Sequence, residues 1–223
     1  MIGKRCFRLA SAAIALTVAT GPVLYAASAP KAGAGAGASA SAETPAVPPV
    51  VKSTCMACHG MRGISVTATY PDLAGQWKSY LTRQLMDFKS HARADPQAPV
   101  MWSMAAPLDK KQIQQIAQYF AEQPHASAHV YDPKLAAVGR KLYYGGIPSE
   151  KVPACMACHG ATLAGIPPFF PMLAGQKRGY VKEQLEYFKA GKRANDPKGM
   201  MRYIASKLDK KQITALAEFI RAH

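Results

Sequence analysis

The six residues CMACHG occur at 55–60 and again, letter for letter, at 155–160. Two cysteines separated by two residues can hold zinc, shuttle a disulfide or attach a haem. In both copies a histidine directly follows the second cysteine, and Cys-x-x-Cys-His is the attachment signature of c-type haem. The hexapeptide therefore predicts two covalently attached haem c groups with iron-binding histidines. The predicted residues are Cys55, Cys58, His59, Cys155, Cys158 and His159.

The other two chemistries fit the spacing less well. Two Cys-x-x-Cys pairs that share one zinc ion are typically about 15–20 residues apart, whereas 96 residues separate Cys58 from Cys155. Zinc also gives no reason for a histidine after each pair. A dithiol oxidoreductase places its cysteines within a βαβ pattern, and the chain shows no convincing alternation of apolar and polar residues. Haem attachment is the interpretation that gives a role to both cysteines and to the histidine of each motif.

The whole chain repeats itself at an offset of one hundred residues without a gap. LAGQ at 73–76 recurs at 173–176, and LDKKQI at 108–113 recurs at 208–213. Such self-similarity indicates two copies of one structural unit. We expect a first domain at 51–125 and a second at 126–223. Further single residues match across the copies: Tyr80, Gln84, Leu85, Phe88, Lys89 and Arg93 recur as Tyr180, Gln184, Leu185, Phe188, Lys189 and Arg193.

Each copy is predicted to be helical. Apolar residues recur at helical spacing over 77–88 and 180–188. A last helix begins at Asp109 or Asp209, and the glutamine three residues later completes a capping-box pattern. The second copy alone has an earlier helix over 132–145, with Leu135, Val138 and Leu142 expected to face inward. In the first copy that helix is missing or very short. The predicted fold class is all-α.

The N-terminus has the features of an export signal. Three basic residues precede an apolar run over 9–27, and small residues follow. We predict a signal peptide at 1–29, and the alternative is an uncleaved membrane anchor. Cleavage would lower the formal charge of +15 to +12, because it removes three basic and no acidic residues. Residues 30–50 are rich in Ala, Gly, Ser and Pro, which predicts a low-complexity flexible tether.

The repeat also selects candidates for the sixth ligand of each iron. The remaining histidines have no counterpart in the other copy, and Met56 and Met156 lie inside the attachment loop. Only Met101 and Met201 recur elsewhere, each 42 residues after its haem histidine. A methionine at this position could simply fill core, but repetition at matched spacing favours ligation. His/Met ligation raises the reduction potential of a haem.

The matched motifs resemble class I cytochromes c, and the tandem arrangement resembles the dihaem cytochrome c4 family. CMACHG, the P-x-LAGQ segments, the Tyr-x3-Gln-Leu-x2-Phe-Lys pattern, the methionine before LDKKQI and the final amphipathic helix support this over 51–223. The resemblance implies two class I cytochrome c-like domains related by a pseudo-twofold axis, with haem propionates facing their interface. It also implies that the carbonyls of Pro71 and Pro171 accept a hydrogen bond from the haem histidines. The shortened start of the first copy departs from the family pattern.

These patterns predict a periplasmic dihaem c-type cytochrome that carries electrons and is not an enzyme. The resemblance implies a quinol-oxidising complex and a terminal oxidase as partners. The basic surface could favour acidic partners or an anionic membrane, which an uncleaved signal would keep close. We expect no nucleic-acid partner for an exported protein. The alternatives are the cytochrome subunit of a periplasmic dehydrogenase and, less well supported, a dihaem peroxidase, which needs one open iron.

Overall fold

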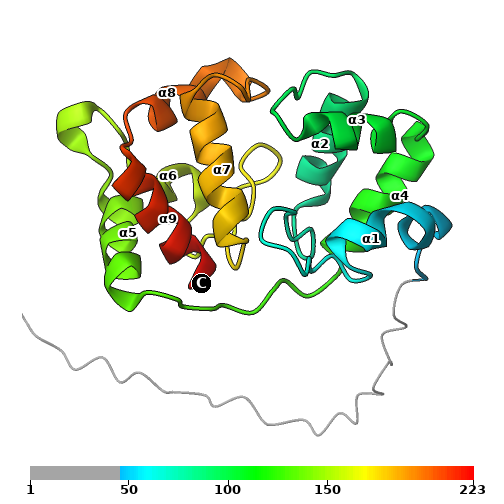
Figure 1. Ribbon diagram of the computed structural model, residues 1–223, viewed down its shortest axis with the longest axis horizontal. Helices are drawn as coiled ribbons and strands as arrows, with labels where there is room; N and C mark the ends of the chain where they lie inside the picture. The colour runs from blue at the N-terminus through cyan, green and yellow to red at the C-terminus, as the bar shows by residue number, and fades with distance from the viewer. Residues whose placement is uncertain (1–45) are drawn as a thin grey trace, which may run out of the picture. The chain divides into compact units, whose positions relative to one another are not determined.

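The computed structural model describes residues 46–223, and the predicted signal peptide and most of the predicted tether lie outside them. These residues form helices joined by loops (Figure 1). The described part has no β-strand, only isolated bridges between Ile147 and Val152 and between Ile166 and Phe170. No helix within 46–223 has the length and apolar character needed to cross a membrane. The predicted all-α class is confirmed.

The first half has four α-helices and one preceding π-helical turn. The elements are η1 (Val51–Cys55), α1 (Met56–His59), α2 (Lys78–Lys89), α3 (Ala98–Ala105) and α4 (Lys110–Ala121). Helices α2 and α4 pack around a core that includes Leu81, Ile113 and Phe120. Val47 and Val50 also pack against this core, so the packed part of the first half extends ahead of residue 51.

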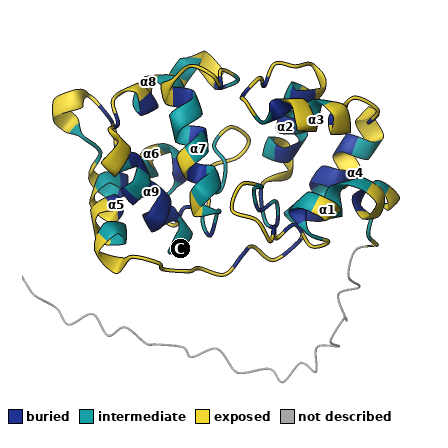
Figure 2. Ribbon diagram, viewed as in Figure 1, coloured by how far each residue is buried: buried dark blue, intermediate teal, exposed yellow. Residues whose placement is uncertain are grey.

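The second half repeats this plan and adds a helix at its start. Its elements are α5 (Pro133–Gly145), η2 (Pro148–Glu150), α6 (Met156–His159), α7 (Arg178–Lys189), η3 (Pro197–Gly199), α8 (Met200–Ser206) and α9 (Lys210–Arg221). Figure 2 shows the buried faces of α9 and of its counterpart α4. In α9 the buried residues include Ile213, Leu216 and Ile220, as their helical spacing predicted.

Helix α5 packs on α9 through a face that is shifted from the expected one: Leu142 packs against the core, but Val138 does not. Val138 is half exposed, whereas Gly139 and Tyr143 are buried. A Cβ atom built on Gly139 would lie 2.0 Å from the backbone oxygen of Ala215. The missing side chain therefore allows the two helix backbones to approach closely, and this rotates the buried face of α5 away from Val138. The expectation that Val138 faces inward was wrong.

The last helix of each half begins with the capping box that the sequence predicted. The carboxylate of Asp109 accepts from the backbone N–H of Gln112 at 2.7 Å, and the Gln112 side chain accepts from the Asp109 N–H at 2.9 Å. Asp209 and Gln212 make the same pair of bonds, at 2.7 and 2.8 Å. Both helices therefore begin with two of their free N-terminal donors satisfied.

Candidate functional site

Each attachment motif forms a one-turn helix that ends at a glycine. The second cysteine and the histidine lie in α1 or α6, and Gly60 and Gly160 end these turns with φ of 74° and 77°. All four motif cysteines are free and partly buried. Burial raises the pKa of Cys55 and of Cys155 to about 11. In each half, two thiols one helical turn apart are thus available for thioether bonds to one porphyrin edge.

The two motif histidines have identical surroundings. Nδ1 of His59 lies 3.0 Å from the carbonyl oxygen of Pro71, and Nδ1 of His159 lies 3.0 Å from that of Pro171. These are the contacts that the family resemblance implied. Because Nδ1 donates to a carbonyl, Nε2 is the nitrogen left to bind a metal. Burial lowers the pKa of both rings, although the carbonyl contacts partly oppose this, so the neutral form that binds iron is favoured.

The two candidate methionines lie on short helices that the sequence analysis did not predict. Met101 is in α3, between α2 and α4, and Met201 is in α8, between α7 and α9. Met101 is partly buried and packs against a small cluster with Phe88 and Ala105. The structure thus places the motif histidine and the candidate methionine of each half on different helices.

The described residues do not support a shared zinc site. Within residues 46–223, no group of three or more His, Cys, Asp and Glu side chains could hold a metal ion. Each half instead has a motif histidine with an available Nε2 and a candidate methionine thioether. That donor set suits haem iron, whose other ligands come from the porphyrin.

Buried arginines join the two halves. Arg93 donates to Gln84 of its own half at 2.9 Å, and to Gln184 and the Tyr180 hydroxyl of the other half at 2.9 and 3.2 Å. Arg193 makes the reciprocal contacts: it donates to Gln184 of its own half at 2.7 Å, and to Gln84 and the Tyr80 hydroxyl of the other half at 3.0 and 3.1 Å. The sequence analysis noted the repetition of these residues but gave them no role. The network comprises Tyr80, Gln84, Arg93, Tyr180, Gln184 and Arg193.

This network contains more positive than negative charge. Arg93 pairs with the buried carboxylate of Asp95 at 2.7 Å. The corresponding partner of Arg193 is the neutral Asn195, at 3.0 Å, and the described residues give Arg193 no carboxylate. Both arginine side chains are buried. Buried charges are normally paired, and Arg193 has no carboxylate partner among the described residues. The positive charge of this network would therefore favour the binding of further anions, and haem propionates are anions of this kind.

The backbone after each attachment motif is fixed by a tyrosine from a different element in each half. The Tyr119 hydroxyl on α4 donates to the carbonyl of Met61 at 3.0 Å. The Tyr144 hydroxyl on α5 donates to the equivalent carbonyl, that of Ala161, at 2.8 Å. The second half therefore uses its additional helix for a contact that the first half makes from its last helix.

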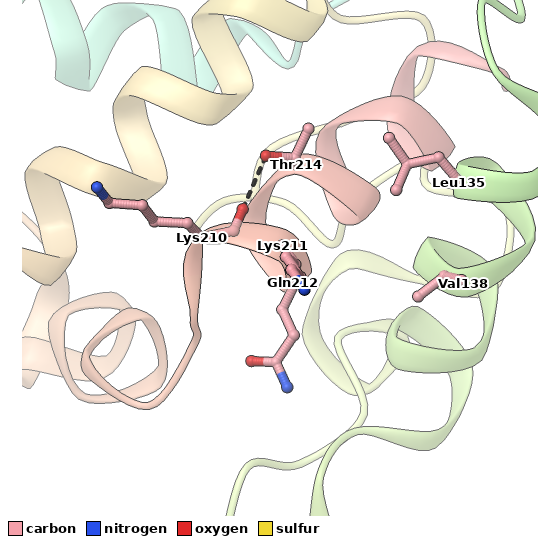
Figure 3. Close-up of a pocket in the computed structure, with 6 residues that line it drawn as sticks. All are labelled: Leu135, Val138, Lys210, Lys211, Gln212 and Thr214. Carbon is pink, nitrogen blue, oxygen red and sulfur yellow. Dashed lines mark hydrogen bonds between the residues drawn. The ribbon is translucent and has the colours of Figure 1, made fainter.

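A surface hollow of about 470 Å³ lies between α5 and the start of α9 (Figure 3). Leu135 and Val138 line one side, and the other side is lined by Lys210, Lys211, Gln212 and Thr214. The Thr214 hydroxyl bonds to the carbonyl of Lys210 at 2.7 Å within the same helix. None of the lining residues belongs to the attachment motifs, so we assign this hollow no part in the site.

Several known proteins are similar to this chain. A family model described as cytochrome c matches residues 49–123 and 136–223. Cytochrome c4 of Thiocapsa roseopersicina is 42% identical over 173 residues, which cover 75% of this chain and 85% of the relative. The crystal structure of reduced recombinant cytochrome c4 from Pseudomonas stutzeri matches with a TM-score of 0.70 and 39% identity, covering 76% of this chain and 93% of that one. A protein of Thiomonas intermedia named thiosulfate dehydrogenase electron acceptor is 36% identical, covering 79% of this chain and 81% of its own length.

Proposed function

The chain belongs to the cytochrome c4 family, and we propose how its own residues hold the two haem groups of that family. It is an electron-carrying cytochrome with two covalently attached haem c groups. In our proposal Cys55 and Cys58 form the thioethers of the first haem, with His59 and Met101 as the axial ligands. The second haem uses the residues at the same repeat positions, which are Cys155, Cys158, His159 and Met201.

One observation supports this assignment above all others. The same histidine–carbonyl contact occurs in both halves at the same distance of 3.0 Å, and it leaves the same ring nitrogen available. A bound haem supplies one-electron chemistry at its iron. The protein orients the imidazole through Pro71 or Pro171, supplies a thioether, and excludes water by packing. With a histidine and a methionine bound, neither iron would have an open position for a substrate.

We therefore propose that this chain is not an enzyme. A dihaem peroxidase needs an iron that can bind peroxide, which paired methionine ligands prevent. Carbon monoxide tests the difference, because it binds ferrous haem that has an open or weakly closed position. We expect the reduced protein to keep its visible spectrum under carbon monoxide, whereas rapid binding to one haem would favour the peroxidase.

The methionine assignment is tested by replacing each residue with alanine. Met201→Ala should lower the potential of one haem, because methionine ligation raises it, and should let that haem bind carbon monoxide. Met101→Ala should do the same to the other haem. Met200→Ala is a matched control, since this neighbouring methionine has no counterpart in the first half. Unchanged redox and ligand-binding behaviour in Met201→Ala would remove that residue from the site.

For partners, we propose redox proteins with acidic docking surfaces. The chain has a formal charge of +15 at pH 7, and a basic surface speeds encounters with acidic partners. A quinol-oxidising complex as donor and a terminal oxidase as acceptor fit a carrier with high-potential haems. The N-terminal sequence supports export to the periplasm, with membrane association if the signal is not cleaved and anionic lipid attracts the basic surface. Electron transfer rates that are independent of salt would contradict electrostatic docking.

A second candidate donor is a periplasmic dehydrogenase. The Thiomonas intermedia relative is named an electron acceptor of thiosulfate dehydrogenase, and it aligns with most of this chain. Co-purification of this chain with a catalytic subunit, and its reduction when thiosulfate is added to that complex, would favour this role. Reduction only by a quinol-oxidising complex would favour the first candidate.

A further inference from the structure

Two repeated glutamines, at the ends of the LAGQ segments, each hold one backbone residue of the other half. The side-chain amide of Gln76 donates to the carbonyl of Met172 at 2.9 Å and accepts from its N–H at 2.9 Å. Gln176 donates to the carbonyl of Asp72 and accepts from its N–H, both at 2.9 Å. The contacts are reciprocal, and in each the glutamine uses its donor and its acceptor on the same residue.

The orientation of each amide is fixed by its own backbone. The Oε1 atom of Gln76 also accepts from the N–H of Trp77 at 3.0 Å, and that of Gln176 accepts from the N–H of Lys177 at 2.9 Å. Because both contacts of Oε1 are with N–H donors, the oxygen and the nitrogen of the amide cannot exchange places without losing them. The acceptor of each amide therefore faces the other half.

The residue that each glutamine holds directly follows the proline that binds the haem histidine. The Pro71 carbonyl and the Asp72 N–H are the two ends of one planar peptide group. That carbonyl accepts from His59, and that N–H donates to Gln176. The peptide between Pro171 and Met172 links His159 to Gln76 in the same way.

We propose that these glutamines are positioning residues for the haem ligands of the opposite half. Gln176 acts on His59 and Gln76 acts on His159, through one peptide group in each case. This inference rests on the proposed ligation of iron by the two histidines. The glutamine fixes the plane of the peptide and so the direction in which its carbonyl points. An acceptor on the N–H also polarises the carbonyl and strengthens its bond to the histidine.

The expected consequence is a change in potential at the opposite haem. A stronger hydrogen bond from Nδ1–H makes the imidazole a more basic ligand, which favours ferric iron and lowers the potential. Loss of the glutamine should therefore raise the reduction potential of the haem in the opposite half. One hydrogen bond strengthens the next in a chain by roughly 10–30%. On this basis we expect about a threefold change in the equilibrium constant for reduction. For one electron, a tenfold change corresponds to 59 mV, so a threefold change corresponds to about 28 mV.

Gln76→Leu in the full dihaem protein is the primary test. Met172 has no charged side chain, whereas the carboxylate of Asp72 also accepts from the Ser65 N–H at 2.7 Å and lies 3.5 Å from the Lys177 amine. The Met172 peptide therefore depends more on its glutamine. We expect the equilibrium constant for reduction of the second-half haem to increase about threefold, which raises its potential. The potential of the first-half haem should stay unchanged.

Trp77→Phe is the matched control, because it removes a different hydrogen bond between the halves. The Trp77 indole donates to the carbonyl of Ala164 at 2.7 Å and does not contact the peptide before Met172. It should shift neither potential. Each potential is assigned to a half with a Cys155→Ala/Cys158→Ala protein, which keeps only the first haem. This assignment depends on haem attachment alone, so a failure of the methionine ligation proposal would not affect it.

Spectroelectrochemical titration of the variants decides the question. A shift of the second-half haem alone in Gln76→Leu, or of the first-half haem alone in Gln176→Leu, supports the proposal. No shift, an equal shift of both haems, or a shift in the same half as the substitution would overturn it. If Gln76→Leu does not accumulate with two haems, Gln76→Met, which keeps an unbranched side chain of similar length, and the reciprocal Gln176→Leu give the same test.

Discussion

Replacing Glu218 by leucine should lower the free energy of unfolding of the second half by about 3 kcal/mol. Glu218 is fully buried on α9. Its carboxylate accepts from the N–H groups of Tyr131 and Asp132 at 2.7 and 2.8 Å and pairs with Arg178 at 2.9 Å. It therefore fastens the residues that lead into α5 to α9 and to the start of α7. Leucine keeps the volume but removes every acceptor.

The magnitude follows from the exposure of the partners. Tyr131 and Asp132 are at the surface, so water can replace part of each lost bond, and the cost is about 1 kcal/mol for each N–H. The Arg178 side chain is 45% exposed and can be solvated, so the ion pair adds about 1 kcal/mol rather than the larger penalty of a stranded buried charge. Glu218→Gln keeps one acceptor oxygen and should cost about half as much.

Guanidinium unfolding of the ferric protein measures this change, with two probes that report on different regions. Both tryptophans, Trp77 and Trp102, are in the first half, so their fluorescence follows that half while circular dichroism follows all helices. Gln118→Leu is the matched control, because Gln118 occupies the position of Glu218 in the first repeat and contacts only the nearby Glu122 side chain. A loss below 1 kcal/mol in Glu218→Leu, or an equal loss in the control, would refute the reasoning.

The Glu218 contribution should also depend on pH. Burial alone would raise the pKa of its carboxyl group, but the hydrogen bonds from Asp132, Arg178 and Tyr131 hold it below the usual 4.5. A carboxylate with a lowered pKa stabilises the folded state fully above its unfolded pKa and loses that contribution as the pH falls through the folded pKa. The stability difference between wild type and Glu218→Gln should be constant near neutral pH and shrink below about pH 4.5. A difference that grows on acidification would contradict this sign.

Four further variants test the attachment motif and the second-half fold. Cys155→Ala combined with Cys158→Ala should leave one covalent haem for each chain by the pyridine haem assay, and two remaining haems would contradict the attachment. Gly139→Ala should destabilise the protein by about 3 kcal/mol in guanidinium unfolding, because its Cβ would lie 2.0 Å from a backbone oxygen of α9. Gly145→Ala, which has no atom within 4 Å of the added Cβ, should leave the midpoint unchanged. Tyr144→Phe should cost about 0.5 kcal/mol by the same method, because water can replace its lost hydrogen bond to the exposed carbonyl of Ala161.

The sequence predicted the parts of each half whose cause is local. Apolar spacing located the buried face of α9, and Asp209 with Gln212 located its start, because a capping box needs only four consecutive residues. The same reasoning failed for Val138. Which face of α5 is buried depends on how closely that helix approaches α9, and this is set by Gly139 against a backbone 76 residues away. Helical periodicity contains no information about that distance.

The short helices that hold Met101 and Met201 were missed for a related reason. Proline lies near the start of each segment, which does not favour a helix, and the run of seven or eight residues is too short for periodicity to be distinctive. Repetition nevertheless selected both methionines as candidates, because a comparison of two copies needs no knowledge of secondary structure. The repeat was thus the more useful guide to the candidate site, and periodicity the more useful guide to the core.

Repeated polar residues contain a further signal, which the symmetry of the fold explains. In an isologous contact, residue i of one copy meets residue j of the other, and j meets i. Gln76 and Arg93 are buried and polar, and neither finds all of its partners within its own half. A buried polar residue that recurs in a tandem repeat and lacks a nearby partner therefore predicts a reciprocal contact between copies.

The same symmetry shows where the two halves must differ. Reciprocal contacts give both halves equivalent hydrogen bonds, so a difference between the two haem environments has to come from positions where the copies differ. Two such positions are close to the proposed haem contacts. Asp95 becomes Asn195, which leaves one buried arginine without a carboxylate, and Asp72 becomes Met172, which removes a carboxylate next to the proline that binds the histidine. Both changes make the second half more positive, and positive charge near a haem favours the reduced iron, so both act in the same direction on the second haem.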